Sequence, residues 1–373
     1  LATFYIFWEL VLIPMFFMIG KWGPEPEKAR RAAIKFLIYT HVGAILMLLG
    51  FIYVYTQLGT FEMTEIAGGL GLTAQKIAMA LVFFGFAFKL PVFPFHTWLP
   101  DAHVEAPSPA SVLLAGLLLK MAGYGFVRSV WLFPMGIEAF KLVFLILAVV
   151  SVLYSASVAI MQEDMKKMIA YSSINHMGYV FLATTAAAVA SIGTISPALN
   201  ISTTSIFEYC MLGAIFVMFS HGVIIGILFL LAGIIHHSAG TREISKIEGL
   251  AHKMPWVAFL LLIGGIAAGG MPGMVGFVGE LLVFVGSISG LFDPYWWVSF
   301  AIAGPLIVLA FMIWLNQRVF FGELQLRAKS DIENPSPWEL LPLAILVIPI
   351  ILFGIYPELL NTLMKEAVRA IAP

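Results

Sequence analysis

Six ionisable side chains lie within or near long apolar stretches of this 373-residue sequence. They are Glu9, Lys89, Lys120, His176, His221 and Glu280. Charged side chains are costly at the centre of a bilayer, so those found in apolar spans are functional candidates by default. Histidine exchanges protons near neutral pH with little perturbation. Together these residue types favour conduction of protons or other ions through a bundle of helices.

Lys89 follows an apolar, phenylalanine-rich run and precedes a Lys-Leu-Pro-Val-Phe-Pro sequence that must interrupt a helix. Burial disfavours the ammonium form of a lysine, whereas a nearby carboxylate favours it. Glu9 is the natural carboxylate partner if the first and third predicted helices touch, and a lysine whose charge follows a carboxylate can act as a proton switch. The alternatives are a static ion pair that fixes helix packing, or a lysine that snorkels to the interface.

Lys120 lies in the middle of an apolar span, where a snorkelling side chain reaches neither interface easily. Glu280 follows a second interruption, Gly-Gly-Met-Pro-Gly, and is the counterpart of Lys89 in the second half of the chain. His176 and His221 fit a proton relay or a packing role equally well. The case for His41 as a functional residue is weaker.

The remaining histidines and the glycines suggest no further chemistry. His96 follows the first break and could line a cavity, whereas His103, His236, His237 and His252 are expected near the membrane interfaces. No His/carboxylate pattern has the spacing of metal ligands. The glycines that recur every third residue from Gly270 to Gly279 favour close helix packing, since no phosphate-loop motif follows them.

The composition explains where these residues must sit. Hydrophobic residues make up 61% of the chain and charged residues only 11%, against about 25% charged in a soluble domain. The mean hydropathy of +0.98 predicts an all-α polytopic membrane protein. A net charge of −1 argues against nucleic acid as a partner, and the single cysteine, Cys210, excludes a disulfide within the chain and a Cys-ligated cluster.

Ten apolar runs are long enough to cross a bilayer, and we expect two of them to be discontinuous helices. They are 1–20, 33–57, 76–100, 107–131, 139–160, 168–190, 207–236, 255–290, 295–320 and 338–356. The breaks fall in 76–100 and 255–290, one in each half, which is typical of an inverted-repeat transporter. No linker separates the halves, so we expect a single domain over 1–373.

The distribution of basic residues sets the expected orientation. Thirteen of the 20 lysines and arginines fall in loops on one side if each of the ten runs crosses once. The positive-inside rule places that side in the cytoplasm and both chain ends outside. Counting 255–290 as two crossings would weaken this bias, so we expect one broken helix there.

The segment from Lys89 to Lys120 resembles the antiporter-like subunits of complex I, and its signature is long and specific. Further matches are Phe7-Trp8-Glu9-Leu10, the run from Ala170 to Gly178, and Gly270-Met-Pro-Gly through Glu280. The resemblance covers essentially the whole chain. In having a glutamate at position 280 the chain resembles the M (chain 4) type of subunit, because the sister pumping subunits usually carry lysine at this position. The family has fourteen transmembrane helices, so the resemblance implies that this chain lacks the first four, in accord with its start at Leu1.

The resemblance also implies roles for the six residues. Glu9 would modulate Lys89, the central lysine of the first half-channel, and Lys120 would connect the two halves. His176 and His221 match histidines of the central hydrophilic axis, and Glu280 would be the terminal group of the second half-channel. The role of His41 stays open. Quinone reduction elsewhere in the complex would shift the Glu9–Lys89 pairing, and the coupled groups would titrate as a set.

The implied protein is a proton-translocating subunit of a prokaryotic NADH-quinone oxidoreductase, in the cytoplasmic membrane. Its partners would be the lipid bilayer and other membrane subunits, including sister antiporter-like subunits. Quinone, flavin and Fe–S clusters are expected in other subunits, with no cofactor or redox centre in this chain. The alternatives are a subunit of a multi-subunit sodium/proton antiporter or of a membrane-bound hydrogenase, and the sequence leaves the electron donor open.

Overall fold

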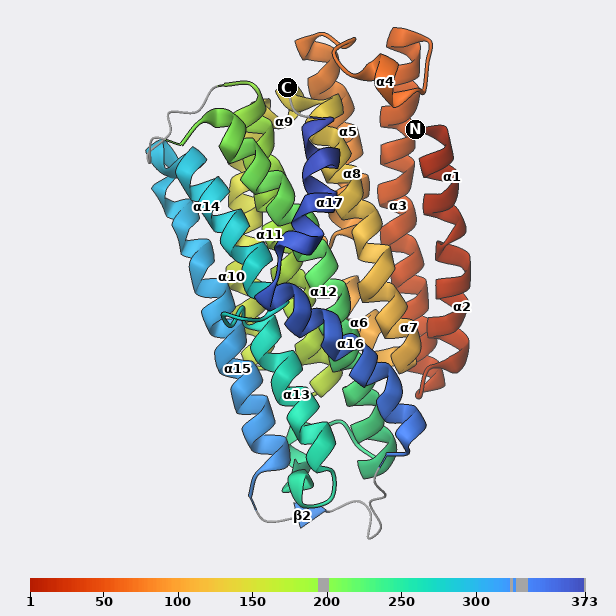
Figure 1. The fold of residues 1–373 in the computed structure, drawn as a ribbon. Coiled ribbons are helices and arrows are strands. Elements are labelled where there is room, and N and C mark those ends of the chain that lie inside the picture. Colours follow the sequence, from red (N-terminus) through yellow and green to blue (C-terminus); the bar gives the residue numbers. More distant parts are fainter. Residues whose placement is uncertain (194–200, 323–324, 327–334, 372–373) are drawn as a thin grey trace.

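The computed structural model describes residues 1–193, 201–322, 325–326 and 335–371, and these residues form an elongated bundle of helices (Figure 1). The first half contains α1 (Ala2–Leu10), α2 (Leu12–Trp22), α3 (Pro26–Leu58), α4 (Met63–Ile66), α5 (Leu72–Lys89), α6 (Trp98–Glu105), α7 (Ser108–Leu113), the π-helical turn η1 (Leu114–Leu118), α8 (Leu119–Leu132), α9 (Pro134–Ala139) and α10 (Lys141–Ile160).

The second half begins with the central helices α11 (Met165–Ser191) and α12 (Thr203–Ala239). After them come η2 (Ile244–Lys246), β1 (Ile247–Glu248), η3 (Leu250–His252), α13 (Pro255–Ala268), α14 (Val275–Tyr295), η4 (Trp296–Ile302), α15 (Ala303–Phe320), β2 (Gln325–Leu326), α16 (Pro337–Ile355) and α17 (Glu358–Arg369). The strands β1 and β2 pair antiparallel, with Ile247 opposite Leu326.

The ten predicted spans each coincide with a helix or a pair of helices. Within the described residues, eight helical stretches are long and apolar enough to cross a membrane, and α13 and α14 are shorter apolar helices. The one remaining predicted span, 168–190, corresponds to α11, which is more polar than the other spans. Its side chains are buried from Met165 to Ala190 almost without exception, so this helix lies inside the bundle, away from lipid.

Both predicted helix breaks are confirmed. The first broken helix stops with α5 at Lys89 and resumes with α6 at Trp98, and two prolines in the interval remove backbone donors. The second stops with α13 at Ala268 and resumes with α14 at Val275. Figure 1 shows the two broken helices crossing the bundle in opposite directions, as an inverted arrangement requires. The chain from 255 to 290 therefore crosses once, as expected.

The loops predicted to share the basic side do gather at one end of the bundle. Ion pairs join them there: Lys35 Nζ lies 2.7 Å from Asp101, and Arg242 pairs with Asp164. A pocket of about 880 Å³ lies between the loops and is lined by residues from 24–35, 101–105, 161–167 and 236–243. The basic residues at 327 and 329, counted with this side, lie outside the described residues. The start of α1 and the end of α17 lie toward the opposite end (Figure 1).

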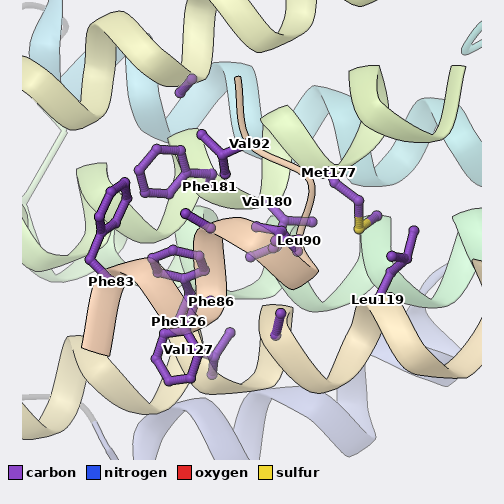
Figure 2. Close-up of a cluster of buried hydrophobic side chains, with 14 of the residues drawn as sticks. Phe83, Phe86, Leu90, Val92, Leu119, Phe126, Val127, Met177, Val180 and Phe181 are labelled. Carbon is purple, nitrogen blue, oxygen red and sulfur yellow. The ribbon is translucent and has the colours of Figure 1, made fainter. Parts of the chain in front are cut away.

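Apolar side chains from four segments fill the centre of the first half. Figure 2 shows Phe83, Phe86, Leu90, Phe126 and Phe181 in one cluster, with further side chains from α8 and α11 around them. Phe83 stacks on Phe144 at 4.7 Å, and Phe86 meets Phe126 edge-on at 5.2 Å between ring centroids. This cluster holds α5, α8, α10 and α11 together and so fixes the position of the first break.

Candidate proton-transfer site

The first ionisable group surrounds Glu9, in the last turn of α1. Pro14 has no N–H to bond the carbonyl of residue 10, so one backbone hydrogen bond is missing between α1 and α2, while Val11 between them keeps helical dihedral angles (φ −70°, ψ −20°). Glu9 Oε2 lies 2.9 Å from His41 Nδ1 of α3. The other carboxylate oxygen, Oε1, is buried and has no hydrogen-bond partner among the described residues.

Lys89 is the last residue of α5 and only 1% exposed. Its Nζ donates to the Trp8 carbonyl oxygen at 3.1 Å and lies 3.7 Å from the centroid of the Trp8 ring. A lysine ammonium over an indole face makes a favourable cation–π contact. The predicted contact between the first and third helices is therefore present, but the partner of Lys89 in this structure is Trp8, while the Glu9 carboxylate is held by His41.

The second group begins with Lys120, one residue into α8. The preceding π-helical turn, Leu114–Leu118, changes the hydrogen-bonding pattern of the backbone, and the carbonyl of Ala115 accepts a hydrogen bond from Lys120 Nζ. Lys120 Nζ also contacts Nδ1 of His221 on α12. When the lysine is charged, Nδ1 must be the acceptor, which leaves the proton of the neutral ring on Nε2.

His221 continues this group toward the second helix break. Its ring centroid lies 5.4 Å from that of His176, and its buried Nε2 has no partner among the described residues. His176 Nε2 in turn lies 3.6 Å from Oε1 of Glu280 on α14. Lys120, His221, His176 and Glu280 thus follow one another in space from α8 across α12 and α11 to α14.

The second break supplies a partner for His176. The ring faces the carbonyl of Ser172 from Nδ1, at 2.7 Å, and the carbonyl of Ala268 from Nε2, at 2.9 Å. Ala268 is the last residue of α13, where carbonyls lack partners within the helix and carry the negative end of its dipole. A neutral imidazole can donate to only one of these two carbonyls, whereas the cation donates to both.

Glu280 is packed against the same break. It is buried, and its Oε1 makes no hydrogen bond among the described residues. Gly270, in the interval between α13 and α14, has φ of +64°, and a Cβ at this position would overlap Oε2 of Glu280. The glycine therefore serves two purposes, because it allows the left-handed backbone and leaves room for the carboxylate.

An apolar layer adjoins both groups of ionisable residues. Leu90 follows Lys89 in the chain and Leu119 precedes Lys120, and Figure 2 shows both leucines in one buried cluster with Met177 and Val180. All four side chains are fully buried and belong to the same hydrophobic cluster. The charged residues of the two halves are therefore embedded in closely packed apolar side chains.

Two expectations about histidines need correction or refinement. His103 was expected near an interface, but it is fully buried, stacked on Phe229 at 4.4 Å, and neither ring nitrogen has a hydrogen-bond partner among the described residues. It lies near the end of α6, next to Val104 and Glu105 of the pocket at the basic end, but its ring is on the face of α6 that packs against Phe229 of α12. His96 is also buried, and its ring stacks on Phe93 at 5.7 Å. Among the described residues, no group of three or more His, Cys, Asp or Glu side chains could hold a metal ion.

Sequence reasoning did not identify three features of the site: the Trp8 ring beneath Lys89, the π-helical turn before Lys120, and the Ala268 carbonyl on His176. The first had a signal, since Trp8 precedes Glu9 and an aromatic face commonly accompanies a buried cation. The other two are backbone features with no sequence signal that we recognise.

The chain matches a family model described as NADH:quinone oxidoreductase/Mrp antiporter, transmembrane, over residues 1–309. A relative named NADH-quinone oxidoreductase subunit M from Rhodobacter capsulatus is 40% identical over 384 residues, covering 99% of this chain and 70% of its own. F(420)H(2) dehydrogenase subunit M from Methanosarcina mazei is 37% identical over 388 residues, covering 100% and 73%.

A solved structure of respiratory complex I from Thermus thermophilus with bound NADH contains a chain of the same fold. That chain has a TM-score of 0.87 and 29% sequence identity, and the match covers 100% of this chain and 74% of that one. The family match covers most of the sequence, and the relatives are similar over nearly its full length. The chain belongs to the NADH:quinone oxidoreductase/Mrp antiporter transmembrane family.

Proposed function

We propose that this chain is a proton-translocating membrane subunit of an NADH-quinone oxidoreductase, respiratory complex I. In this proposal residues 1–373 act as one transmembrane domain, and the redox chemistry takes place in other subunits. Sister antiporter-like subunits would be its neighbours, the cytoplasmic membrane its location, and quinone, flavin and Fe–S clusters would belong to the rest of the complex. The names of the relatives and the complex I fold support this assignment.

One observation carries the proposed mechanism: Lys120, His221, His176 and Glu280 follow one another through the interior of the bundle. Lysine, histidine and carboxylate side chains each bind and release a proton, and neighbouring groups of this kind titrate as a coupled set. Protons would pass from Lys89 to Lys120, then through the two histidines to Glu280. The apolar layer beside Lys89 and Lys120 would limit proton flow when the charges are not aligned.

Glu9 would control the beginning of this path. A carboxylate near the Lys89 ammonium stabilises the charged form, and its withdrawal destabilises that form in a buried site. Quinone reduction elsewhere in the complex would change the position of Glu9 and so release or retain the proton of Lys89. The proposal assigns proton transfer to six residues: Glu9, Lys89, Lys120, His176, His221 and Glu280.

The test measures proton uptake per electron pair in vesicles that contain the whole complex. We expect Lys89→Met and Glu9→Gln to abolish proton translocation linked to quinone reduction. Lys253→Met and Glu163→Gln make the same chemical changes at exposed positions of the basic end and should leave it unchanged. Normal translocation in both Lys89→Met and Glu9→Gln would contradict the proposal, and sodium-driven proton exchange without quinone turnover would favour an antiporter subunit instead.

A further inference from the structure

We propose that His41 is a positioning residue that competes with Lys89 for the carboxylate of Glu9 and thereby sets the charge of Lys89. This inference rests on the proposed function, because it names the group that takes Glu9 away from the lysine. The resemblance to the antiporter-like subunits assigned His41 no role.

The carboxylate of Glu9 is divided between two environments. Oε2 contacts His41 Nδ1 on the outer face of the bundle, where the His41 side chain is 53% exposed and that of Glu9 is 25% exposed. Oε1 is buried without a hydrogen-bond partner among the described residues. A buried carboxylate oxygen that lacks a hydrogen-bond donor destabilises the folded state, so a donor that reached Oε1 would stabilise Glu9 in an inward position.

Lys89 can supply this donor. Its Nζ is held by the carbonyl and ring of Trp8, the residue adjacent to Glu9, and it is near enough to feel the charge of the carboxylate. Moving Glu9 from His41 toward Lys89 therefore exchanges one cation for the other within a single turn of α1. Pro14 removes one backbone hydrogen bond from the helix close to Glu9, although Val11 keeps helical dihedral angles (φ −70°, ψ −20°).

The charge of His41 decides between the two positions. A protonated His41 forms an ion pair with Glu9, and Lys89 is left buried with only Trp8 as a partner, so it releases its proton and becomes a neutral amine. A neutral His41 binds Glu9 weakly, and the carboxylate is free to stabilise the Lys89 ammonium. The titratable groups that face Glu9 are His41 from α3, Lys89 from α5 and Tyr5, one turn earlier on α1.

The position of His41 is suited to receiving a signal. It lies on a spanning helix, in the exposed face formed by α1 and α3, and not in the interior with the other ionisable residues of the path. An event that adds or removes a proton or a charge at this face acts on His41 first and on Lys89 only through Glu9. His41 itself need not carry any of the translocated protons.

The experiment uses the whole complex in vesicles and compares His41→Gln, His41→Lys and a matched control, His252→Gln, at an exposed loop histidine. His41→Gln removes the competing cation, and His41→Lys makes it permanent. We expect both changes to lower proton uptake per electron pair, because neither side chain can alternate between a charged and a neutral form as histidine does. In addition, the pH profile of proton uptake should differ from that of wild type in both His41 variants, whereas His252→Gln keeps the wild-type profile.

Thermal unfolding separates competition from a structural role. His41→Lys can still form an ion pair with Glu9, so it should keep the stability of the wild-type complex and nevertheless lower proton uptake. An unchanged pH profile in both His41 variants, or a loss of proton uptake in His41→Lys that is matched by a loss of thermal stability, overturns the inference. If His41→Gln does not assemble, the pH profile of His41→Lys decides the question alone.

The two proposals fail in different ways. If the proposed function is wrong, Lys89→Met and Glu9→Gln leave proton uptake intact. If only the present inference is wrong, those two variants lose proton uptake while His41→Gln and His41→Lys behave as wild type at every pH.

Discussion

At the residue scale, His221 is the link between Lys120 and the second half of the path. Glutamine at this position keeps a hydrogen-bonding group for the lysine but cannot bind and release a proton. We expect His221→Gln to lower proton uptake per electron pair at least ten-fold, since a positioned acid–base group typically contributes about 10²- to 10⁴-fold. The measurement is proton uptake in vesicles containing the complex, with His237→Gln near the end of α12 as the control.

One result for His221→Gln would contradict this prediction. Proton uptake close to that of wild type, with the complex assembled normally, would mean that Lys120 passes its proton by another route or that His221 only packs against it. A packing role would show instead as lower thermal stability with proton uptake intact.

At the element scale, the second helix break depends on Gly270. An alanine there needs a left-handed backbone, which costs about 1–2 kcal/mol, and its Cβ would in addition displace the Glu280 carboxylate. We therefore expect Gly270→Ala to lose both stability and proton uptake. Gly273 shares the positive φ, +88°, but a Cβ there would meet nothing within 4 Å.

Gly273→Ala is thus the matched control for Gly270→Ala. It should lose a similar amount of stability, measured as the shift in thermal unfolding, and keep proton uptake. If both variants lose proton uptake equally, the effect comes from the backbone of the break and not from the position of Glu280.

The breaks themselves could be predicted from the sequence, because prolines and glycines within apolar runs have a direct steric consequence. The burial of Lys89 followed from the phenylalanines before it. The partner of Glu9 could not be predicted in the same way, since it depends on which face of α3 meets α1. The periodicity of α3 does not reveal this, because apolar residues surround the helix on all sides.

The π-helical turn and the His176–Ala268 contact escaped prediction for a related reason. Both are backbone arrangements that arise from packing between distant segments, and no residue type marks them. The burial of His103 was not predicted because the end of an apolar run does not show which face of the helix another helix covers. The number of spans and the positions of the helix breaks could thus be predicted from the sequence, whereas the pairing of side chains could not.

At the scale of the whole molecule, the pocket at the basic end brings together loops that are distant in sequence. Glu105 lies in it, 4% exposed, with one carboxylate oxygen lacking a partner among the described residues. Burial raises the pKa of Glu105 above its usual range, although Arg242 opposes the shift. A raised pKa in the folded state favours folding at low pH, and this contribution is lost as the pH rises through the folded value.

Glutamine resembles the protonated carboxyl, so Glu105→Gln should match wild type in stability below about pH 4, the range in which an ordinary glutamate is protonated. Near neutral pH the variant should be more stable, by about 1 kcal/mol, because it avoids an unpartnered buried charge. Thermal unfolding of the purified protein at several pH values measures the difference. A variant less stable than wild type at neutral pH would mean that attraction to Arg242 outweighs burial.

The direction of the whole bundle in the membrane can be tested through cysteine labelling, because the native Cys210 is buried and should not react. Glu163 lies among the loops of the basic end, and Lys76 lies near the end where α1 begins, and both are exposed. We expect the Glu163 end to face the cytoplasm, because the loops at that end hold the excess of basic residues. A membrane-impermeant maleimide should therefore label Glu163→Cys in inside-out vesicles and Lys76→Cys in right-side-out vesicles. The reverse labelling pattern would contradict the orientation predicted from the basic residues.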